Sequence, residues 1–268
     1  MTKTKIGIAG CLGRMGKELL KAVNNNPNLQ FSGGFEIKSN PNIGKSIGTI
    51  LDLDISELLT DNPHDVFKAS QVIIDFTTPE STEKNLLIAS DLKTPMVIGT
   101  TGLTRKTKDL IKEVSLSIPL VQSYNMSIGV NLLLNLVEDA AKKLNEDEYD
   151  AEIFEIHHKH KIDAPSGTAI SLGEAVARGR SVNFDDKKIF DRTNNKLARK
   201  AGDIGFAVLR AGEIQGEHTV NFLGNHDQLS LSHKTSNRSI FVNGAIKAAE
   251  WIISKKSGIY SMKDVLGI

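Results

Sequence analysis

The sequence has a single cysteine, Cys11, in 268 residues. One thiol provides no disulfide framework and cannot build a cysteine-based zinc site. No run of apolar residues is long enough to span a bilayer, and Met1–Lys5 leads into a predicted strand without the apolar core of a signal peptide. We therefore expect a soluble protein of the cytoplasm.

The sequence also lacks an excess of charge of either sign. Its 33 Lys and Arg residues nearly balance 32 Asp and Glu residues, so the formal net charge is +1. This balance gives no general attraction to nucleic acid or to a membrane surface, and we expect neither as a partner. Hydrophobic residues make up 40% of the chain, enough to bury the core of one large or two medium domains.

The N-terminal segment has the pattern of a strand, a glycine turn and an amphipathic helix. The predicted strand covers Lys5–Ala9, and glycines follow at Gly10, Gly13 and Gly16. This G-x-x-G-x-x-G spacing differs from the commoner G-x-G-x-x-G. Its glycines can still provide a tight turn, close approach to a pyrophosphate and close helix packing. The alternative is a glycine turn that only packs the helix on the strand.

An acidic residue favours a dinucleotide site over that alternative. Glu36 ends a second predicted strand, Leu29–Phe35, and lies 20 residues beyond Gly16. A carboxylate at this distance can accept hydrogen bonds from the adenosine ribose hydroxyls of NAD. The first two strands therefore predict binding of a nicotinamide dinucleotide.

Further strand–helix units follow the first. Predicted strands at 71–76, 94–98 and 119–122 alternate with helices, as in a parallel α/β sheet. Loops at the carboxyl ends of such strands line the ligand crevice, so Gly99–Gly102 should face the cofactor. Residues 38–65 are irregular and receive no assignment. The pattern predicts an α/β fold with an N-terminal Rossmann-type dinucleotide-binding domain.

After residue 127 the pattern changes to that of a second, α+β domain. A long amphipathic helix at 129–144 is followed by strands at 151–156, 204–210, 218–223 and 229–233. The last two strands are joined by a hairpin-like turn, and a final helix at 238–253 has Ser236 or Asn237 as its cap. We expect this domain to be built on a mostly antiparallel or mixed sheet.

A cluster of basic and imidazole side chains lies at the end of the 151–156 strand. The run His157–Lys161 contains three histidines and two lysines, and Ser166 then begins a predicted helix. The backbone N–H groups of Gly167 and Thr168 would point out of that helix start, where negative charge is favoured. We therefore expect an anionic substrate with more than one carboxylate.

Other functions remain open for this cluster. His158 and His160 alternate onto one face of an extended chain, which would suit a zinc site, although the two lysines disfavour a dication. A metal-dependent hydrolase would use both histidines together with His157, whereas the prediction is that the site holds no metal. A solvated basic loop does not explain the helix start. A dinucleotide-binding redox sensor would not need the cluster at all.

Six segments of the chain together resemble the 4-hydroxy-tetrahydrodipicolinate reductase family, long called dihydrodipicolinate reductase. They are Gly10–Gly16, Asp75–Thr77, Val97–Gly102, His157–Ala169, Ile204–Phe206 and Gly216–His218. The run His-His-x-His-Lys-x-Asp-Ala-Pro-Ser-Gly-Thr-Ala is highly specific to that family. The resemblance implies NAD(P)H-dependent reduction of 4-hydroxy-tetrahydrodipicolinate to tetrahydrodipicolinate in diaminopimelate and lysine biosynthesis. It also implies a homotetramer joined through the sheets of the second domains.

The resemblance also implies roles for individual residues. The family's proton donor corresponds to His157, its second catalytic cation to Lys161, and its substrate contacts to His158, Gly167 and Thr168. The expected cofactor-binding residues are Gly10, Cys11, Leu12, Gly13, Arg14, Met15, Glu36, Gly99, Thr100, Thr101, Ser123, Tyr124, Asn125 and Met126. The expected domains are 1–127 with 239–268 for the dinucleotide and 128–238 for substrate binding and oligomerisation.

Residue 37 bears on the choice between the two nicotinamide cofactors. Ile37 stands where many members of the family have an arginine, which would pair with the 2′-phosphate of NADPH. Glu36 repels that phosphate, and only Lys38 and Arg14 could offset the repulsion. We therefore expect NADH to be preferred and NADPH to remain usable.

Overall fold

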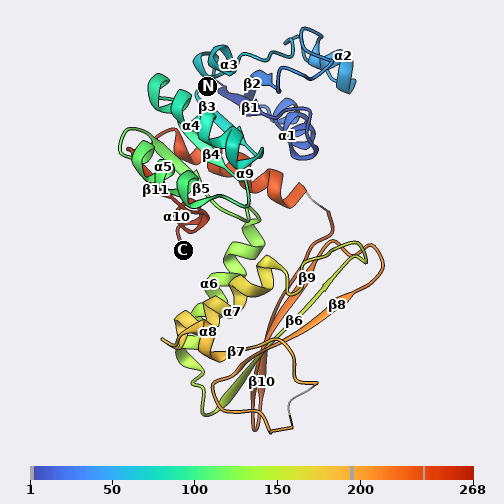
Figure 1. Ribbon diagram of the computed structural model, residues 1–268, viewed down its shortest axis with the longest axis vertical. Coiled ribbons are helices and arrows are strands. Elements are labelled where there is room, and N and C mark those ends of the chain that lie inside the picture. The colour runs from blue at the N-terminus through green and yellow to red at the C-terminus, as the bar shows by residue number, and fades with distance from the viewer. Residues whose placement is uncertain (1–2, 194–195, 238) are drawn as a thin grey trace. The chain divides into compact units, whose positions relative to one another are not determined.

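The computed structural model describes residues 3–193, 196–237 and 239–268 (Figure 1). The chain divides into two compact units. Unit 1 comprises Met1–Ile128 and Ser239–Gly267, and unit 2 comprises Gly129–Arg238 and Ile268. Within the described ranges, no helix has both the length and the apolar character needed to cross a membrane.

Unit 1 is built on a six-stranded parallel sheet in the order β11-β5-β4-β3-β1-β2. Its strands are β1 (Thr4–Ala9), β2 (Leu29–Phe35), β3 (Val72–Asp75), β4 (Met96–Ile98), β5 (Pro119–Gln122) and β11 (Gly258–Tyr260). The chain runs outward from β1 to β2 and then returns to place β3 on the other side of β1. Ligands of open α/β sheets bind at the carboxyl ends of the strands where the order reverses in this way.

Helices cover both faces of this sheet. Successive side chains of a strand point to opposite sides, so the apolar residues of β3 are buried against helices on each face. In β3, Ile73 packs with the helices α3 (Pro63–Ala69), α4 (Pro79–Leu92) and α5 (Arg105–Ser115). Its neighbour Ile74 packs with α1 (Arg14–Asn25), α9 (Ser239–Ile252) and α10 (Met262–Leu266). The predicted α/β class with a Rossmann-like sheet is confirmed.

Besides the short helix α3, two parts of unit 1 were not anticipated from the sequence. The segment 38–65, which received no assignment, contains α2 (Ile47–Leu51) and two isolated bridges, Phe35 with Thr60 and Ser46 with Leu58. At the other edge, β11 adds a sixth strand beside β5. Both parts are short, and each is held by contacts with residues far away in the sequence rather than by a local pattern.

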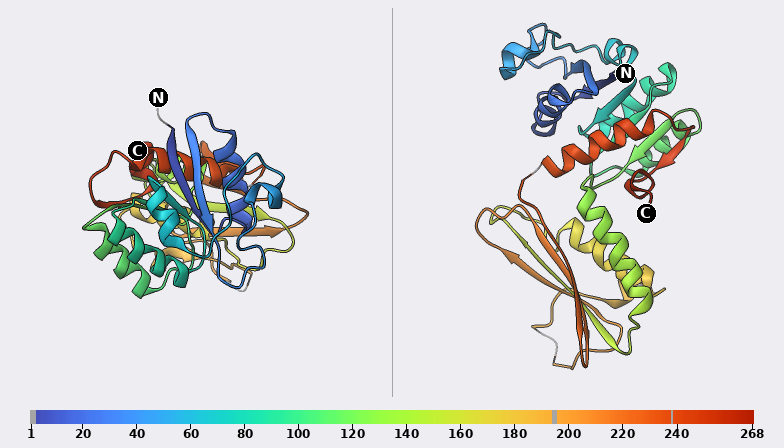
Figure 2. Two further views of the ribbon diagram at one scale, coloured as in Figure 1. Left: turned by 90° about the horizontal axis from the view of Figure 1, so that it is seen from above. Right: turned by 180° about the vertical axis from the view of Figure 1, so that it is seen from behind.

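Unit 2 contains a five-stranded mixed sheet in the order β10-β9-β6-β8-β7, with helices packed on one of its faces (Figures 1 and 2). Its elements are α6 (Ile128–Lys143), β6 (Tyr149–His157), α7 (Gly167–Gly179), α8 (Phe184–Lys187), β7 (Lys188–Ile189), β8 (Ile204–Arg210), β9 (Glu217–Gly224) and β10 (Gln228–Lys234). Strand β6 runs parallel to β8 and antiparallel to β9. The expected mixed sheet is confirmed. Helix α9 is described from Ser239, and Arg238, where the final helix was predicted to begin, lies outside the described residues.

The burial pattern of β6 separates a core face from an open face. Ala151, Ile153, Glu155 and His157 are buried, whereas the residues between them are more exposed. The apolar pair packs against α6 and α7 in the core of unit 2. The alternation therefore carries two polar residues, Glu155 and His157, along the buried face to the end of the strand.

Candidate active site

Strand β6 ends with a buried acid and a buried histidine. Glu155 is fully buried and His157 is only 8% exposed. On the neighbouring strand β9, His218 lies opposite Glu155 and is also buried. The rings of His157 and His218 meet edge to face, with centroids 5.0 Å apart. Two adjacent strands thus deliver three ionisable side chains to one place.

The Glu155 carboxylate contacts a different set of groups with each oxygen. Its Oε2 lies 2.7 Å from Nδ1 of His157, and its Oε1 accepts hydrogen bonds from Ser166 N at 2.8 Å and from the Arg210 guanidinium at 3.1 Å. Burial alone would raise the pKa of Glu155, but the bonds from His157, Ser166 and Arg210 outweigh it and lower the pKa to about 2. Glu155 is therefore an anion at neutral pH.

His218 is held beside this carboxylate as a neutral ring. Its Nε2 lies 3.1 Å from Ser166 Oγ and 3.7 Å from Glu155 Oε2. Burial, followed by the nearby charge of His157, lowers the pKa of His218 to about 4. His218 therefore supports Ser166 without adding charge to the site.

The start of helix α7 has the form that the sequence predicted. Ser166 is the N-cap, and its Oγ accepts a hydrogen bond from Ala169 N at 3.2 Å. Gly167 and Thr168 form the first turn of the helix. No atom lies within 4 Å of the position that a Cβ of Gly167 would take. There is thus room for a ligand beside Gly167.

Two positive side chains pair with groups in and beside the loop that leads to this helix. Lys161 Nζ lies 2.8 Å from Asp163 Oδ1, and this hydrogen bond, working against partial burial, lowers the pKa of the Asp163 carboxyl. The Arg210 guanidinium, already paired with Glu155, also donates to the Asp163 carbonyl. Lys161 and the helix start together favour a bound anion.

The structure divides the basic run into two parts. Lys159 Nζ and His160 Nε2 lie 3.4 Å and 3.8 Å from Glu213 Oε1, and both side chains are largely exposed. His157 and Lys161 instead have mostly buried side chains, and His158 is intermediate. The lysine and histidine at 159 and 160 therefore belong to a surface loop.

The metal alternative would place His157, His158 and His160 around one ion. In the part of the chain that the structure describes, the one group close enough for this is Glu155, His157 and His218, whose candidate ligand atoms lie within 4.8 Å of one another. Arg210 already neutralises the carboxylate of that group. Its charge balance suits proton handling better than a dication.

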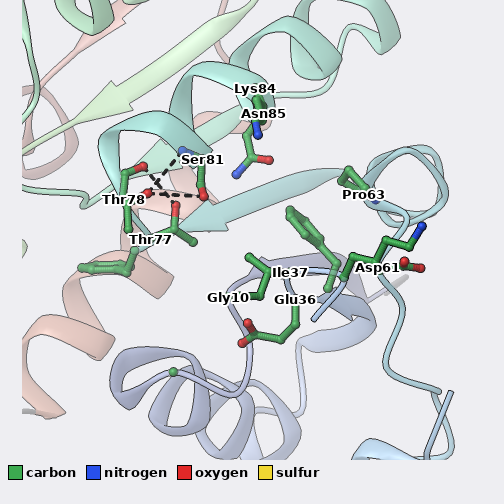
Figure 3. Close-up of a pocket in the computed structure, with 14 residues that line it drawn as sticks. Gly10, Glu36, Ile37, Asp61, Pro63, Thr77, Thr78, Ser81, Lys84 and Asn85 are labelled. Atoms are coloured by element: carbon green, nitrogen blue, oxygen red, sulfur yellow. Dashed lines mark hydrogen bonds between the residues drawn. The ribbon is translucent and has the colours of Figure 1, made fainter. Parts of the chain in front are cut away.

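Unit 1 has a cavity of about 590 Å³ at the carboxyl ends of β1, β2 and β3 (Figure 3). Of the residues expected to bind the cofactor, Gly10, Gly13 and Glu36 line it. Lys84 and Asn85 of α4 reach toward it from the opposite wall. The volume falls in the range of small-molecule sites.

The glycine turn has the close packing that a pyrophosphate site requires. Gly10 has φ of +61°, a conformation that other residues rarely adopt, and a Cβ on Gly16 would lie 2.3 Å from the Gly10 carbonyl oxygen. Helix α1 begins after Gly13 without a side-chain cap. The bare helix start and the turn therefore fit a dinucleotide phosphate.

The Glu36 carboxylate is held at this turn by the backbone. Its Oε1 accepts a hydrogen bond from Leu12 N at 2.9 Å. Ile37 and Lys38 follow it along the cavity wall, and Ile37 is 65% exposed. The acid at the end of β2 thus lines the cavity beside an uncharged neighbour, and its contact with a ribose stays a prediction.

A buried aspartate that was given no role fixes the loops next to the cavity. Asp75 Oδ1 accepts from Thr77 N at 3.0 Å, from Thr77 Oγ1 at 2.6 Å and from Thr100 Oγ1 at 3.3 Å. Its Oδ2 accepts from Asn85 Nδ2 at 3.0 Å. One carboxylate therefore joins the loop after β3, the loop after β4 and helix α4.

Other expected cofactor residues lie apart from the cavity lining. The segments Gly99–Thr101 and Ser123–Met126 follow the ends of β4 and β5. The side chains of Cys11, Thr100 and Met126 are buried, so contact with a cofactor would come from their backbone. Burial, then the charge of Glu36, raises the pKa of Cys11 to about 12. That thiol is therefore not a reactive group.

Sequence reasoning assigned no role to Glu155, Arg210 or His218. The signal for Glu155 was available, because it lies two residues before His157 and must share its face of the strand. Arg210 and His218 lie on other strands, and only the register of β6 with β8 and β9 brings them to the site.

Two family models match the chain in succession. Residues 4–126 match the model described as dihydrodipicolinate reductase, N-terminus, and residues 129–266 match the corresponding C-terminus model. The break between them falls at the boundary between the two compact units.

Full-length relatives carry the name 4-hydroxy-tetrahydrodipicolinate reductase. The relative from Polynucleobacter necessarius is 43% identical over 98% of this chain and 99% of its own. The relative from Nitrosospira multiformis is 41% identical over 100% of this chain and 99% of its own. A solved dipicolinate-bound dihydrodipicolinate reductase from Paenisporosarcina sp. TG-14 has a TM-score of 0.77 at 23% identity, covering 98% of this chain and 99% of that one. This last likeness shows the fold alone.

The lowered pKa of His218 predicts a loss of stability in mild acid. The unfolded chain binds a proton at this histidine near pH 6.5, whereas the folded protein does so only near pH 4. The contribution of His218 is therefore complete above pH 6.5 and is lost as the pH falls toward 4. It amounts to about 2 kcal/mol of unfolding free energy between pH 7.5 and pH 5.

Urea unfolding at both pH values tests this prediction. His218→Gln should reduce the difference between pH 7.5 and pH 5 by about that amount. His226→Gln, at an exposed histidine in the β9–β10 turn, should keep the wild-type difference. An unchanged difference in His218→Gln would show that this ring is not held neutral by burial.

Proposed function

Because the chain belongs to the dihydrodipicolinate reductase family, we propose that unit 1 binds the nicotinamide cofactor and that unit 2 binds and protonates the substrate. The reaction is the NAD(P)H-dependent reduction of 4-hydroxy-tetrahydrodipicolinate to tetrahydrodipicolinate in diaminopimelate and lysine biosynthesis. The family resemblance of the sequence motifs is confirmed. The observation that carries the residue assignment is the contact of buried Glu155 with both His157 and the start of α7.

The reaction requires a proton donor in unit 2. The substrate is a cyclic imine dicarboxylate that loses water, its hydroxyl group together with a proton of the neighbouring ring carbon, and then gains hydride at the carbon that carried the hydroxyl. This leaves an enamine-like anion whose neighbouring carbon must take up a proton. His157 is the proton donor in this proposal, since histidine exchanges protons near neutral pH and general-acid help contributes about 10²–10⁴ in rate. The Glu155 carboxylate at Nδ1 leaves Nε2 of His157 to face the substrate.

The carboxylates of the substrate require positive groups. The N–H groups of Gly167 and Thr168 at the start of α7 would bind one carboxylate. Lys161 would pair with a carboxylate and withdraw charge from the reacting ring, and His158 would complete the contact. Dipicolinate, the ligand bound in the Paenisporosarcina neighbour, is also a flat dicarboxylate and would serve as a substrate mimic here.

The residues of unit 1 fit a nicotinamide dinucleotide, which supplies the hydride when bound. The glycine turn at Gly10–Met15 would hold the pyrophosphate, and Glu36 would accept hydrogen bonds from the adenosine ribose. The loops Gly99–Thr101 and Ser123–Met126, at the ends of β4 and β5, would complete the site on the nicotinamide side.

NADH is the preferred cofactor in this proposal. Glu36 holds its carboxylate at the ribose position, where it repels a 2′-phosphate. Its neighbour Ile37 lines the cavity without a charge, while Lys38 and Lys84 line it as flexible cations that keep NADPH usable. The expected preference is about tenfold in affinity, or about 1.4 kcal/mol.

The open face of the unit 2 sheet supports a homotetramer. Helices α6 and α7 cover one face, whereas Phe154, Leu209 and Leu223 point outward from the other at 37%, 48% and 37% exposure. Exposed apolar side chains on a sheet face mark an interaction surface. In this proposal the faces of two copies pack together, as the resemblance implied. The cytoplasmic location stays a prediction, supported by the biosynthetic role of the relatives.

The catalytic assignment predicts large losses from two single substitutions. His157→Gln removes the proton donor, and Lys161→Ala removes the substrate cation. Each should lower kcat about 10²-fold or more while NADH affinity changes little, because the cofactor residues lie in unit 1. Steady-state NADH oxidation with freshly condensed pyruvate and aspartate semialdehyde measures the rate.

Two neighbours in the same run are matched controls. His160→Gln and Lys159→Ala make the same chemical changes at exposed positions that pair with Glu213. Both should remain within about threefold of the wild-type rate. If His157→Gln were as active as His160→Gln, His157 would not be the proton donor.

The cofactor proposal predicts the effect of a new arginine at residue 37. Ile37→Arg should tighten NADPH about tenfold through a paired contact with the 2′-phosphate and change NADH little. Leu116→Arg adds the same charge at a residue that is 82% exposed elsewhere in unit 1, and it should change neither affinity. Fluorescence titrations of both cofactors measure the effect. Tighter binding of NADPH than of NADH by the wild type would contradict the proposal.

The oligomer proposal predicts the effect of a charge on the open sheet face. Leu209→Asp should convert a tetramer into smaller species in sedimentation velocity, because it would bury an unpaired carboxylate between two sheets. Leu116→Asp, on the exposed end of α5, should leave the tetramer intact. A wild-type protein that sediments as a monomer at micromolar concentration would rule out this interface.

A further inference from the structure

We propose that Glu155 is a positioning residue for the reduction, because its carboxylate holds the proton donor and the carboxylate-binding helix start in one fixed relation. The inference rests on the roles proposed above for His157 and α7. Glu155 itself does not touch the substrate. It acts through the groups that do, and His218 completes its support.

The Oε2 oxygen of Glu155 determines which nitrogen of His157 can deliver the proton. Because Oε2 lies 2.7 Å from Nδ1, the carboxylate is within ion-pair distance of that nitrogen, and Nε2 is the nitrogen left to face a substrate. Gly216 provides the space next to Nε2, since a Cβ at residue 216 would lie 2.9 Å from this atom. The carboxylate also stabilises the protonated ring that must form before each proton transfer.

The Oε1 oxygen of Glu155 determines where the substrate carboxylate can bind. Oε1 accepts from Ser166 N, the backbone group directly before Gly167 and Thr168. Ser166 is fixed from the other side by His218, whose Nε2 lies 3.1 Å from the hydroxyl oxygen. The first turn of α7 therefore cannot shift without breaking a buried bond to Glu155 or to His218.

Arg210 extends the same support to Lys161. Its guanidinium pairs with Glu155 and donates to the carbonyl of Asp163, whose carboxylate in turn lies 2.8 Å from Lys161 Nζ. Three of the groups proposed to contact substrate are therefore tied to one buried carboxylate. His157 contacts it directly, the start of α7 is tied to it through Ser166, and Lys161 is tied to it through Arg210 and Asp163.

The positioning role proposed for Glu155 requires its negative charge as well as the length and geometry of its side chain. The charged or titratable groups that contact Glu155 are His157 on its own strand, Arg210 on β8 and His218 on β9. His233 on β10 and Lys161 from the loop act on His218. A glutamine has one acceptor oxygen in place of two. It would satisfy either Nδ1 of His157 or the Ser166 and Arg210 donors, but it could not satisfy both.

The experiment compares Glu155→Gln with the wild type across pH 5 to 9. We expect kcat at pH 7 to fall about 30-fold or more, because the carboxylate that favours the protonated ring is lost. The descending alkaline limb of kcat should move to lower pH by about one unit. Dipicolinate inhibition should weaken about tenfold, while the Kd of NADH stays unchanged. A role in folding alone would not move the alkaline limb.

Two further variants keep the test decisive. Glu155→Asp retains the charge on a shorter side chain, so it should lose kcat but keep the wild-type alkaline limb, and it replaces Glu155→Gln if that variant does not fold. Glu174→Gln changes the same charge at an exposed position of α7 and should match the wild type throughout.

The outcomes separate this inference from the proposed function. A wild-type protein that does not oxidise NADH with the substrate would overturn the proposed function. An active wild type with Glu155→Gln within threefold of its kcat and with the same alkaline limb would overturn the inference alone. An alkaline limb that moves equally in Glu155→Gln and Glu155→Asp would also overturn it, since charge would then not be the cause.

Discussion

The buried carboxylate of Glu155 is the interaction on which the unit 2 site depends. An uncompensated anion in a protein interior costs several kcal/mol, so its neighbours must supply donors. Here they are His157, Ser166 N and Arg210, and their bonds outweigh burial enough to lower its pKa to about 2. To satisfy one carboxylate, the fold brings a histidine from β6, an arginine from β8 and the helix start after a loop to the same place. The chemistry of the site is thus built into the polar core of the sheet.

The candidate site of unit 1 depends on the absence of side chains at the glycine turn rather than on a buried charge. The glycine turn places the start of α1 against the Gly10 carbonyl, where a Cβ on Gly16 would lie 2.3 Å away. Backbone N–H groups can approach a pyrophosphate only where side chains are absent. Asp75 provides the polar counterpart by tying the loops after β3 and β4 together through Thr77 and Thr100. The cavity is therefore bordered by loops that are hydrogen-bonded to Asp75 and by the start of α1, which has no side-chain cap.

The sequence predicted the elements whose signals are local. The strand–turn–helix pattern around Gly10, the acid at Glu36 and the cap at Ser166 each follow from a few adjacent residues, and the structure has them in those places. The strand β11 and the segment containing α2 were missed because non-local contacts hold them. His157 and Lys161 could be singled out by their chemistry and by the family resemblance, because they lie in one short run of the sequence. His218 and Arg210 could not, because only the register of β6 with its neighbours brings them to the site.

The most direct test of this account is the protonation state of the His157 ring. Nitrogen-15 NMR of histidine-labelled enzyme, assigned by comparison with His157→Gln, distinguishes the two neutral tautomers of this ring. If Glu155 holds Nδ1, the neutral ring keeps its proton on Nδ1, with Nε2 free as the atom that is protonated for transfer. A neutral ring that carries its proton on Nε2 would contradict the account, because Glu155 would then not be the group that orients the proton donor.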